Sequence, residues 1–208
     1  MYQALTEEEL GLILNTNEEL TMDVIDAYLE LITHENDKHF GFIPSYVIHY
    51  YRAEEEKFPP DWLQNIIQQK LVDSVKYWLI PAHLNTNHWA LTVMDVHEMR
   101  LHYFDSFSPG STNHQFTIDI FFMFHELCTK SGNNPLAIKF ISFENNPKTI
   151  CRNDLPRQQN AIDCGIFMLM FALDIIDQNN LNAEMHITQS GIKEARKRIY
   201  TQLMTSRL

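Results

Sequence analysis

A cysteine at position 164 stands where a polar stretch, Gln158 to Asp163, runs directly into the apolar segment Gly165 to Leu173. This change predicts a thiol at the N-terminus of a buried helix. The helix dipole there favours the thiolate, which is the nucleophilic form, and free backbone N–H groups can bind a developing oxyanion. A lone cysteine before an apolar helix is more often a packed core residue, so Cys164 alone does not establish catalysis.

A thiol nucleophile requires a general base, and His88 with Asp105 are the candidates for base and orienter. We expect strands at His88 to Met94 and Arg100 to Phe107, joined by a short polar turn. In such a hairpin the two side chains lie within about two rungs of the ladder. The carboxylate can then fix the imidazole tautomer and stabilise the imidazolium. Taken singly, His88 could be a surface or capping histidine and Asp105 a turn former.

Two further side chains are candidates for roles beside the nucleophile. The amide of Gln158 can point an N–H at the oxyanion, although Gln159 beside it shows that a plain loop glutamine is the alternative. Trp89 directly follows the candidate base, where a large ring could cover a narrow channel. An aromatic residue at such a place is more often part of the core, and that alternative stays open.

Periodic apolar residues and turn signals predict the elements that position these side chains. In chain order they are a short helix opened by a Thr6–Glu9 capping box, a helix within Glu19 to Ile32, a short element opened by Phe42 to Tyr46, a helix near Trp62 to Leu71, a strand at Val75 to Ile80, the two hairpin strands, a helix at Gln115 to Lys130, a strand at Leu136 to Phe143, a helix at Asp163 to Asp177 and an amphipathic helix at Thr188 to Leu203. The hairpin carries apolar residues on both faces and is expected to be central. The sequence therefore predicts one α+β domain over residues 1–208.

The composition argues against several other classes of protein. A net charge of -11 makes nucleic-acid binding a poor expectation, because phosphate affinity comes from clustered cations. We interpret the basic cluster of Lys193, Arg196, Lys197 and Arg198 as a solvated face late in the last helix. Three widely spaced cysteines indicate neither a disulfide framework nor a structural zinc site and favour a reducing compartment. The acidic N-terminus does not resemble a signal peptide, and no apolar stretch is long enough for a membrane helix.

Taken together, three segments resemble the ubiquitin-like-protein-specific proteases, the SUMO (sentrin) protease family of the clan CE cysteine peptidases. They are His88-Trp-Ala-Leu-Thr-Val-Met-Asp, Tyr103-Phe-Asp-Ser and Gln158-x-Asn-x-x-Asp-Cys-Gly. The order His, Asp, Gln, Cys is the family's, with 17 residues from His88 to Asp105 and 59 from Asp105 to Cys164. Val24-Ile-Asp-Ala-Tyr and Phe42-Ile-Pro-Ser extend the resemblance over nearly the whole chain.

The resemblance implies a papain-like clan CE fold, with a central mixed sheet flanked by helices and the catalytic cysteine at a helix N-terminus. It implies that His88 is the general base, that Asp105 orients it, that Cys164 attacks and that Gln158 helps to form the oxyanion hole. Trp89 would lid a tunnel that admits a Gly-Gly tail. The implied reaction hydrolyses the bond after that tail through a thioester, in precursor processing or in deconjugation from lysine.

The same resemblance implies no metal and no organic cofactor, and a monomer whose partner is a ubiquitin-like protein or its conjugates. The implied location is the cytoplasm or nucleus, or a host cell if the protein is a secreted bacterial effector. Glu19-Leu-Thr-Met stands where the family usually has Trp-Leu-Asn-Asp, so Glu19 and Met22 leave the choice among SUMO, a Nedd-type modifier and ubiquitin open. Two alternatives are a clan CE acetyltransferase that uses acetyl-coenzyme A and a non-catalytic module that binds ubiquitin-like proteins.

Overall fold

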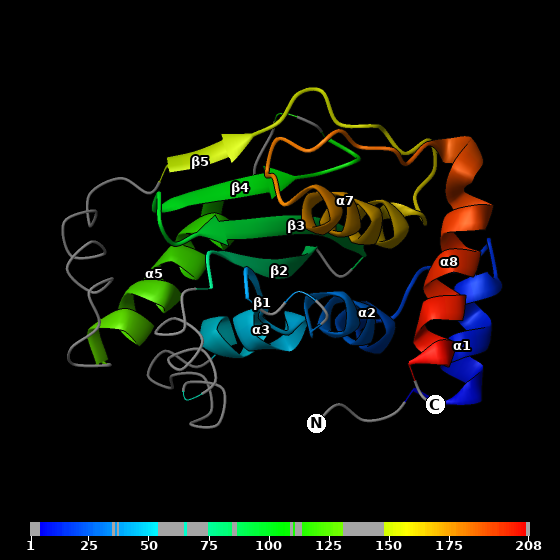
Figure 1. Cartoon of the computed structure of the whole chain (residues 1–208), viewed down its shortest axis with the longest axis horizontal. Coiled ribbons are helices and arrows are strands. Elements are labelled where there is room, and N and C mark those ends of the chain that lie inside the picture. Colours follow the sequence, from blue (N-terminus) through cyan, green and yellow to red (C-terminus); the bar gives the residue numbers. More distant parts are fainter. Residues whose placement is uncertain are drawn as a thin grey trace.

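The structure is a computed structural model of the chain, shown whole in Figure 1. The residues that it describes are 5–34, 36, 38–53, 65, 75–84, 87–108, 110, 114–130 and 148–206. Two predicted elements therefore cannot be compared with the structure. The strand at Leu136 to Phe143 lies outside the described residues, and so does the helix near Trp62 to Leu71 apart from Asn65.

One mixed five-stranded sheet forms the centre of the molecule. Its strands lie side by side in chain order: β1 (Phe40–Phe42), β2 (Tyr77–Leu84), β3 (His88–Asp95), β4 (Arg100–Phe104) and β5 (Lys148–Cys151). The two inner pairs, β2–β3 and β3–β4, are antiparallel, while both edge pairs are parallel. The predicted hairpin is thus the middle of the sheet. All residues of β3 after His88 are buried, which confirms that helices cover both faces.

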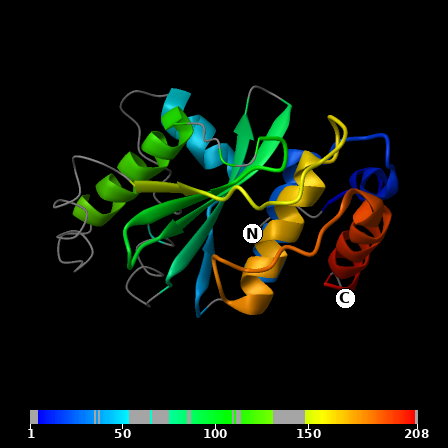
Figure 2. The same ribbon diagram turned by 90° about the horizontal axis from the view of Figure 1, so that it is seen from above.

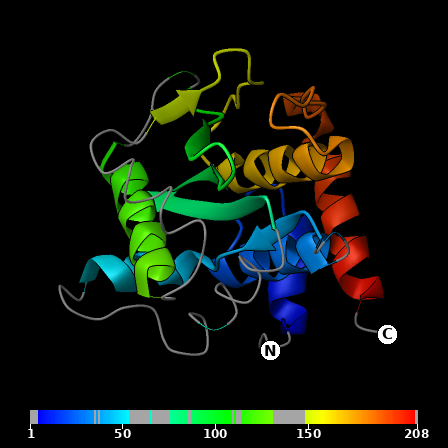
Figure 3. The same cartoon turned by 60° about the vertical axis from the view of Figure 1, so that its left-hand side comes forward.

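Helices cover the two faces of this sheet in separate groups, which Figure 2 shows from above. One face carries α2 (Met22–His34) and α7 (Cys164–Gln178), with α1 (Glu7–Leu14) and α8 (Ile192–Thr205) packed outside them. The other face carries α3 (Ser45–Ala53) and α5 (His114–Lys130). The side chains between these layers form two hydrophobic cores. In Figure 3 α8 runs alongside α1, so the two ends of the described chain lie together.

Local sequence signals explain most of these helices. Thr6 accepts a hydrogen bond from the Glu9 N–H, and the Glu9 carboxylate accepts one from the Thr6 N–H at 2.6 Å, so the predicted capping box is confirmed. The apolar positions predicted for α2 are buried in the core. α7 is apolar almost throughout, and all of its residues from Cys164 to Ile176 are buried.

Three predictions about element ends and surfaces were wrong. The strand expected at Val75 to Ile80 begins at Tyr77 and continues to Leu84. The strand expected to reach Phe107 stops at Phe104, because Asp105 bends the chain by accepting hydrogen bonds from the N–H groups of Phe107 and Ser108. The basic cluster lies in the first half of α8 rather than late in it. Arg196, expected on a solvated face, is 1% exposed. It follows Ile192 by four residues and therefore lies on the apolar stripe of α8.

Candidate active site

Cys164 is the first residue of α7 and is fully buried. Its place follows from the sequence, because the polar segment before it turns and the apolar segment after it must be a buried helix. The next residue, Gly165, packs closely: a Cβ there would lie 3.2 Å from Ile25 Cδ1 and 3.3 Å from Leu20 Cβ. The start of α2 is thus held against the start of α7, and the thiol sits at the positive end of a helix dipole.

His88 and Asp105 meet at the edge of the hairpin next to this helix. Leu91 of β3 pairs with Phe104 of β4, which puts Asp105 one residue beyond the last pair and His88 three residues before it. The Nε2 of His88 lies 3.0 Å from Oδ1 of Asp105. The predicted proximity of these two side chains is therefore present in the structure.

Asp105 is fixed as an ionised acceptor. Besides His88, its Oδ1 accepts from the N–H groups of Phe107 at 2.7 Å and Ser108 at 3.2 Å. Burial works to raise the pKa of Asp105, but the contacts with His88 and these backbone donors hold it below its ordinary value. Burial and the neighbouring Asp105 charge raise the pKa of Tyr103.

His88 lies between this carboxylate and the thiol. Burial alone would lower its pKa, but the hydrogen bond with Asp105 and the interaction with Cys164 raise the pKa of His88 to about 9. Since Nε2 faces Asp105, Nδ1 is the ring nitrogen left for the thiol. The ring edge also meets the ring of Phe107, with centroids 5.8 Å apart. The arrangement favours an imidazolium at neutral pH.

Gln158 is buried beside the same site, whereas its neighbour Gln159 is exposed. The Gln158 Oε1 accepts from the Ser106 hydroxyl at 2.7 Å, and its Nε2 donates to the carbonyl of Asn160 at 2.6 Å. A primary amide carries two N–H donors, so a second one remains on Nε2. Ser106 directly follows Asp105 and thus ties the orienter of the base to the candidate oxyanion donor.

Trp89 is 2% exposed and belongs to the core on the α7 side of the sheet. Its ring stacks on His83 with centroids 4.2 Å apart, and its Cδ1 lies 3.5 Å from where a Cβ on Gly165 would stand. The ring therefore lines the start of the nucleophile's helix from within the core. Its role over a substrate tail stays a prediction.

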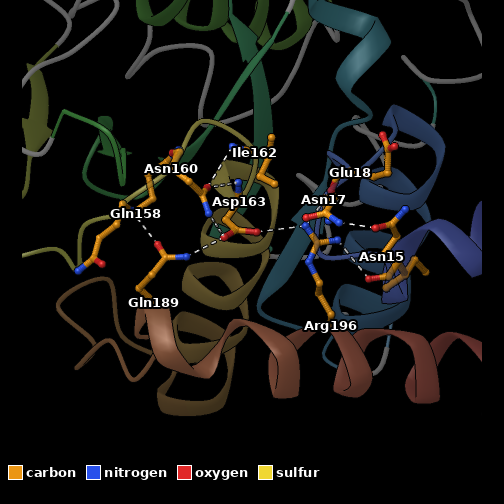
Figure 4. A network of polar contacts seen from close by, with 11 residues as sticks. Asn15, Asn17, Glu18, Gln158, Asn160, Ile162, Asp163, Gln189 and Arg196 are labelled. Carbon is orange, nitrogen blue, oxygen red and sulfur yellow. Dashed lines mark hydrogen bonds and ion pairs between the residues drawn. The ribbon is translucent and has the colours of Figure 1, made fainter.

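Sequence reasoning missed a polar network behind the nucleophile, which Figure 4 shows from close by. Arg196 of α8 forms an ion pair with Asp163, and Gln189 reaches the same carboxylate. The signal for Arg196 was present, because an arginine falls among the apolar positions Ile192, Ile199 and Leu203 of an amphipathic helix. The sequence did not indicate that Asp163 would be the partner of Arg196.

No group of three or more His, Cys, Asp or Glu side chains within the described residues could hold a metal ion. Within the same ranges, no helix combines the length and the apolar character that a bilayer crossing requires.

Comparison with known proteins gives a consistent result. The Ulp1 protease family, C-terminal catalytic domain, matches residues 18–208. A sentrin-specific protease of Caenorhabditis elegans is 24% identical over 201 residues, which are 91% of this chain and 25% of that protein. Human sentrin-specific protease 3 is 24% identical over 209 residues, 98% of this chain and 32% of the relative. The chain thus spans between a quarter and a third of these curated relatives.

Solved structures share the fold. A SUMO protease Ulp1 whose catalytic cysteine is oxidized to a sulfonic acid superposes with a TM-score of 0.72 at 19% identity, over 100% of this chain and 89% of that one. The Ulp1 protease domain in complex with Smt3, the yeast ortholog of SUMO, gives 0.68 at 17% identity, over 100% and 98%. The predicted α+β fold of the clan CE peptidases is confirmed.

Proposed function

The chain belongs to the Ulp1 protease family, and from this premise we propose that it is a cysteine protease that cleaves after the C-terminal Gly-Gly of a ubiquitin-like modifier. The observation that carries the proposal is the hydrogen bond of His88 to Asp105, with Cys164 at the start of α7 near enough to raise the pKa of the same imidazole. These side chains all come from one chain, so we propose a monomer as the active unit and residues 1–208 as one catalytic domain.

The resting enzyme holds a cation beside its nucleophile. With the pKa of His88 at about 9, the imidazole keeps a proton at neutral pH that a free histidine would release. Asp105 stabilises this cation, and Cys164 lies at the N-terminus of α7, where the helix dipole is positive. The groups that favour a negative charge on the nucleophile are therefore in place before the substrate binds.

Attack forms a bond from Cys164 Sγ to the carbonyl carbon of the terminal glycine. The negative charge that develops on the carbonyl oxygen is received by the backbone N–H of Cys164 and by the free N–H of Gln158 Nε2. As the tetrahedral intermediate collapses, His88 gives its proton to the leaving amine and a thioester remains on Cys164. Water, deprotonated by His88, then hydrolyses the thioester and restores the thiol.

A SUMO-like modifier is the substrate that we propose. Its relatives support this choice. Curated relatives are named sentrin-specific proteases, and a solved structure of similar fold is a complex with Smt3. The leaving amine can be a peptide nitrogen of a precursor or the Nζ of a modified lysine, because the chemistry at Cys164 is the same for both. Nedd-type modifiers and ubiquitin are the competing substrates.

A panel of modifier probes tests this proposal. SUMO, a Nedd-type modifier and ubiquitin are each prepared with a C-terminal electrophile that captures a cysteine. We expect the SUMO probe to label the wild type at Cys164 and to leave Cys164→Ala unlabelled, while Cys151→Ser keeps full labelling. No labelling by any of the three probes, with a folded protein, would refute the proposal.

A further inference from the structure

Asp163 begins α7 as its N-cap residue, but its side chain makes no capping hydrogen bond. Aspartate is among the preferred N-caps, and its carboxylate ordinarily accepts from an N–H two or three residues on. Those residues here are Gly165 and Ile166, directly after the nucleophile. The backbone of Asp163, at φ -93° and ψ 3°, lies outside the extended region that capping residues adopt. The residue before Cys164 is therefore turned away from the helix end.

Three side chains hold the carboxylate in this position (Figure 4). Oδ1 of Asp163 accepts from Arg196 Nη2 at 3.1 Å, and Oδ2 accepts from Asn160 Nδ2 at 2.6 Å and Gln189 Nε2 at 2.7 Å. The side chains of Arg196 and Asp163 are 1% and 3% exposed. Both carboxylate oxygens are thus occupied on the side facing α8, away from water.

The same donors brace the segments around the nucleophile. Arg196 also donates to the carbonyl of Ile13 in α1 at 3.2 Å and to that of Glu18 at 2.8 Å. Glu18 lies in the segment that leads to Leu20, which packs against Gly165. The Oε1 of Gln189 accepts from the N–H of Gln159 at 2.7 Å. Gln189 therefore joins the two ends of the segment that carries Gln158 and Asp163.

A capping carboxylate would compete directly with catalysis at this helix end. It would occupy N–H groups at the end of α7 and place a negative charge beside the thiolate and the oxyanion. His88 pairs with Asp105 on the sheet side of Cys164, and Asp163 pairs with Arg196 on the α8 side. Turning the Asp163 carboxylate toward the helix end would add a negative charge there.

We propose that Gln189 and Arg196 are positioning residues of the active site, which hold the Asp163 carboxylate away from the N-terminus of α7. This keeps the helix-end N–H groups available for the thiolate and the oxyanion. The inference rests on the proposed function, since it assigns these residues a part in the chemistry of Cys164.

Gln189→Ala tests the proposal without removing a buried charge, and Gln178→Ala is its matched control. Gln178 also braces a loop through both amide atoms, with bonds to the carbonyl and N–H of Glu184, but far along α7 from the nucleophile. We expect Gln189→Ala to lower kcat about tenfold, a part of what a lost oxyanion donor costs, with KM and the thermal midpoint matching those of the control. Equal kcat in the two variants would overturn the proposal.

A second readout does not depend on any substrate. The rate at which iodoacetamide alkylates Cys164 is measured at several pH values by mass spectrometry of the peptide that carries Cys164. The pH at which this rate is half of its maximum is the midpoint. In Gln189→Ala we expect this midpoint to rise by about one unit, since a carboxylate moves toward the thiolate. An unmoved midpoint would contradict the proposal. A wild type that cleaves no modifier would refute the proposed function and leave this readout standing.

Arg196→Met provides the stronger perturbation. Because it leaves a buried carboxylate without its cation, we measure kcat per folded molecule, with the folded fraction taken from circular dichroism. We expect a loss on the order of 100-fold, and a recovery of about tenfold when Asp163→Asn removes the charge. Wild-type kcat in folded Arg196→Met, or no recovery in the double variant, would contradict the proposal.

Discussion

Asp26 is a buried carboxylate that should make the stability of this protein fall as the pH rises. It is 3% exposed in α2, and its oxygens accept from the N–H and hydroxyl of Ser45 at the start of α3. Burial, which outweighs the hydrogen bonds from Ser45, raises the pKa of Asp26 from 3.8 to about 7. The side chain thus joins two helices on opposite faces of the sheet in its protonated form.

The direction of the effect follows from proton binding. Between about pH 4 and pH 7 the folded chain keeps a proton that the unfolded chain has released, so the free energy of unfolding declines across that window. A shift of about three units corresponds to about 4 kcal/mol, at 1.36 kcal/mol per unit. The contribution is fully present below about pH 4 and is lost above about pH 7.

Asp26→Asn should remove this dependence. The amide oxygen can still accept from the Ser45 N–H, and the amide nitrogen can donate to the Ser45 hydroxyl. We expect the variant to match the wild type below about pH 4 and to exceed it by up to about 4 kcal/mol at pH 8. Urea unfolding at four pH values, followed by tryptophan fluorescence, measures the difference.

The exposed Asp23 of the same helix provides the control. Asp23→Asn removes a carboxylate of equal charge from the surface and should leave the pH dependence close to that of the wild type. If Asp26→Asn declined with pH as steeply as the wild type does, the buried carboxylate would not be the source of the effect and the reasoning would be wrong.

Three further predictions concern the site and the sheet. Asp105→Asn should lower kcat/KM on the order of 10³- to 10⁴-fold, because His88 loses its charge partner. The alkaline limb of the pH profile of kcat/KM should also move below about pH 9. An unmoved limb would contradict the role assigned to Asp105. Gln158→Ala should lower kcat on the order of 10²- to 10³-fold at constant KM, and wild-type kcat would exclude an oxyanion role. Gly41→Ala should lower the free energy of unfolding by about 1–3 kcal/mol, because the added Cβ would lie 2.7 Å from the Trp78 ring. Gly11→Ala is the control, since a Cβ there meets nothing within 4 Å. Equal thermal midpoints for the two variants would refute this prediction.

Local signals in the sequence were enough for much of the fold. The capping box at Thr6 and the helical spacing in α2 depend on residues within a few positions of one another. The hairpin also follows from local pattern, and it brings His88 to Asp105 because a short turn fixes the register. The end of β4 was missed because the side chain of Asp105 competes for the backbone, which apolar periodicity does not show.

The network behind the nucleophile could not be predicted in the same way. Arg196 stands 33 positions from Asp163 and 178 from Glu18, and their contact exists only once α8 packs on α1 and α7. A charged residue on an apolar stripe indicates a buried partner without identifying it. Likewise, Gln158 and Gln159 differ in the sequence only by one position, and the hydrogen bond from the Ser106 hydroxyl distinguishes the buried one.

The central claim is that Cys164 cuts a modifier after its Gly-Gly tail, and the mass of the product tests it most directly. A SUMO precursor with a C-terminal extension is incubated with the wild type, Cys164→Ser and Cys151→Ser, and each product is weighed intact. We predict a product ending at the second glycine for the wild type and Cys151→Ser, and uncut precursor for Cys164→Ser. The same product from Cys164→Ser, or a cut elsewhere, would contradict the account.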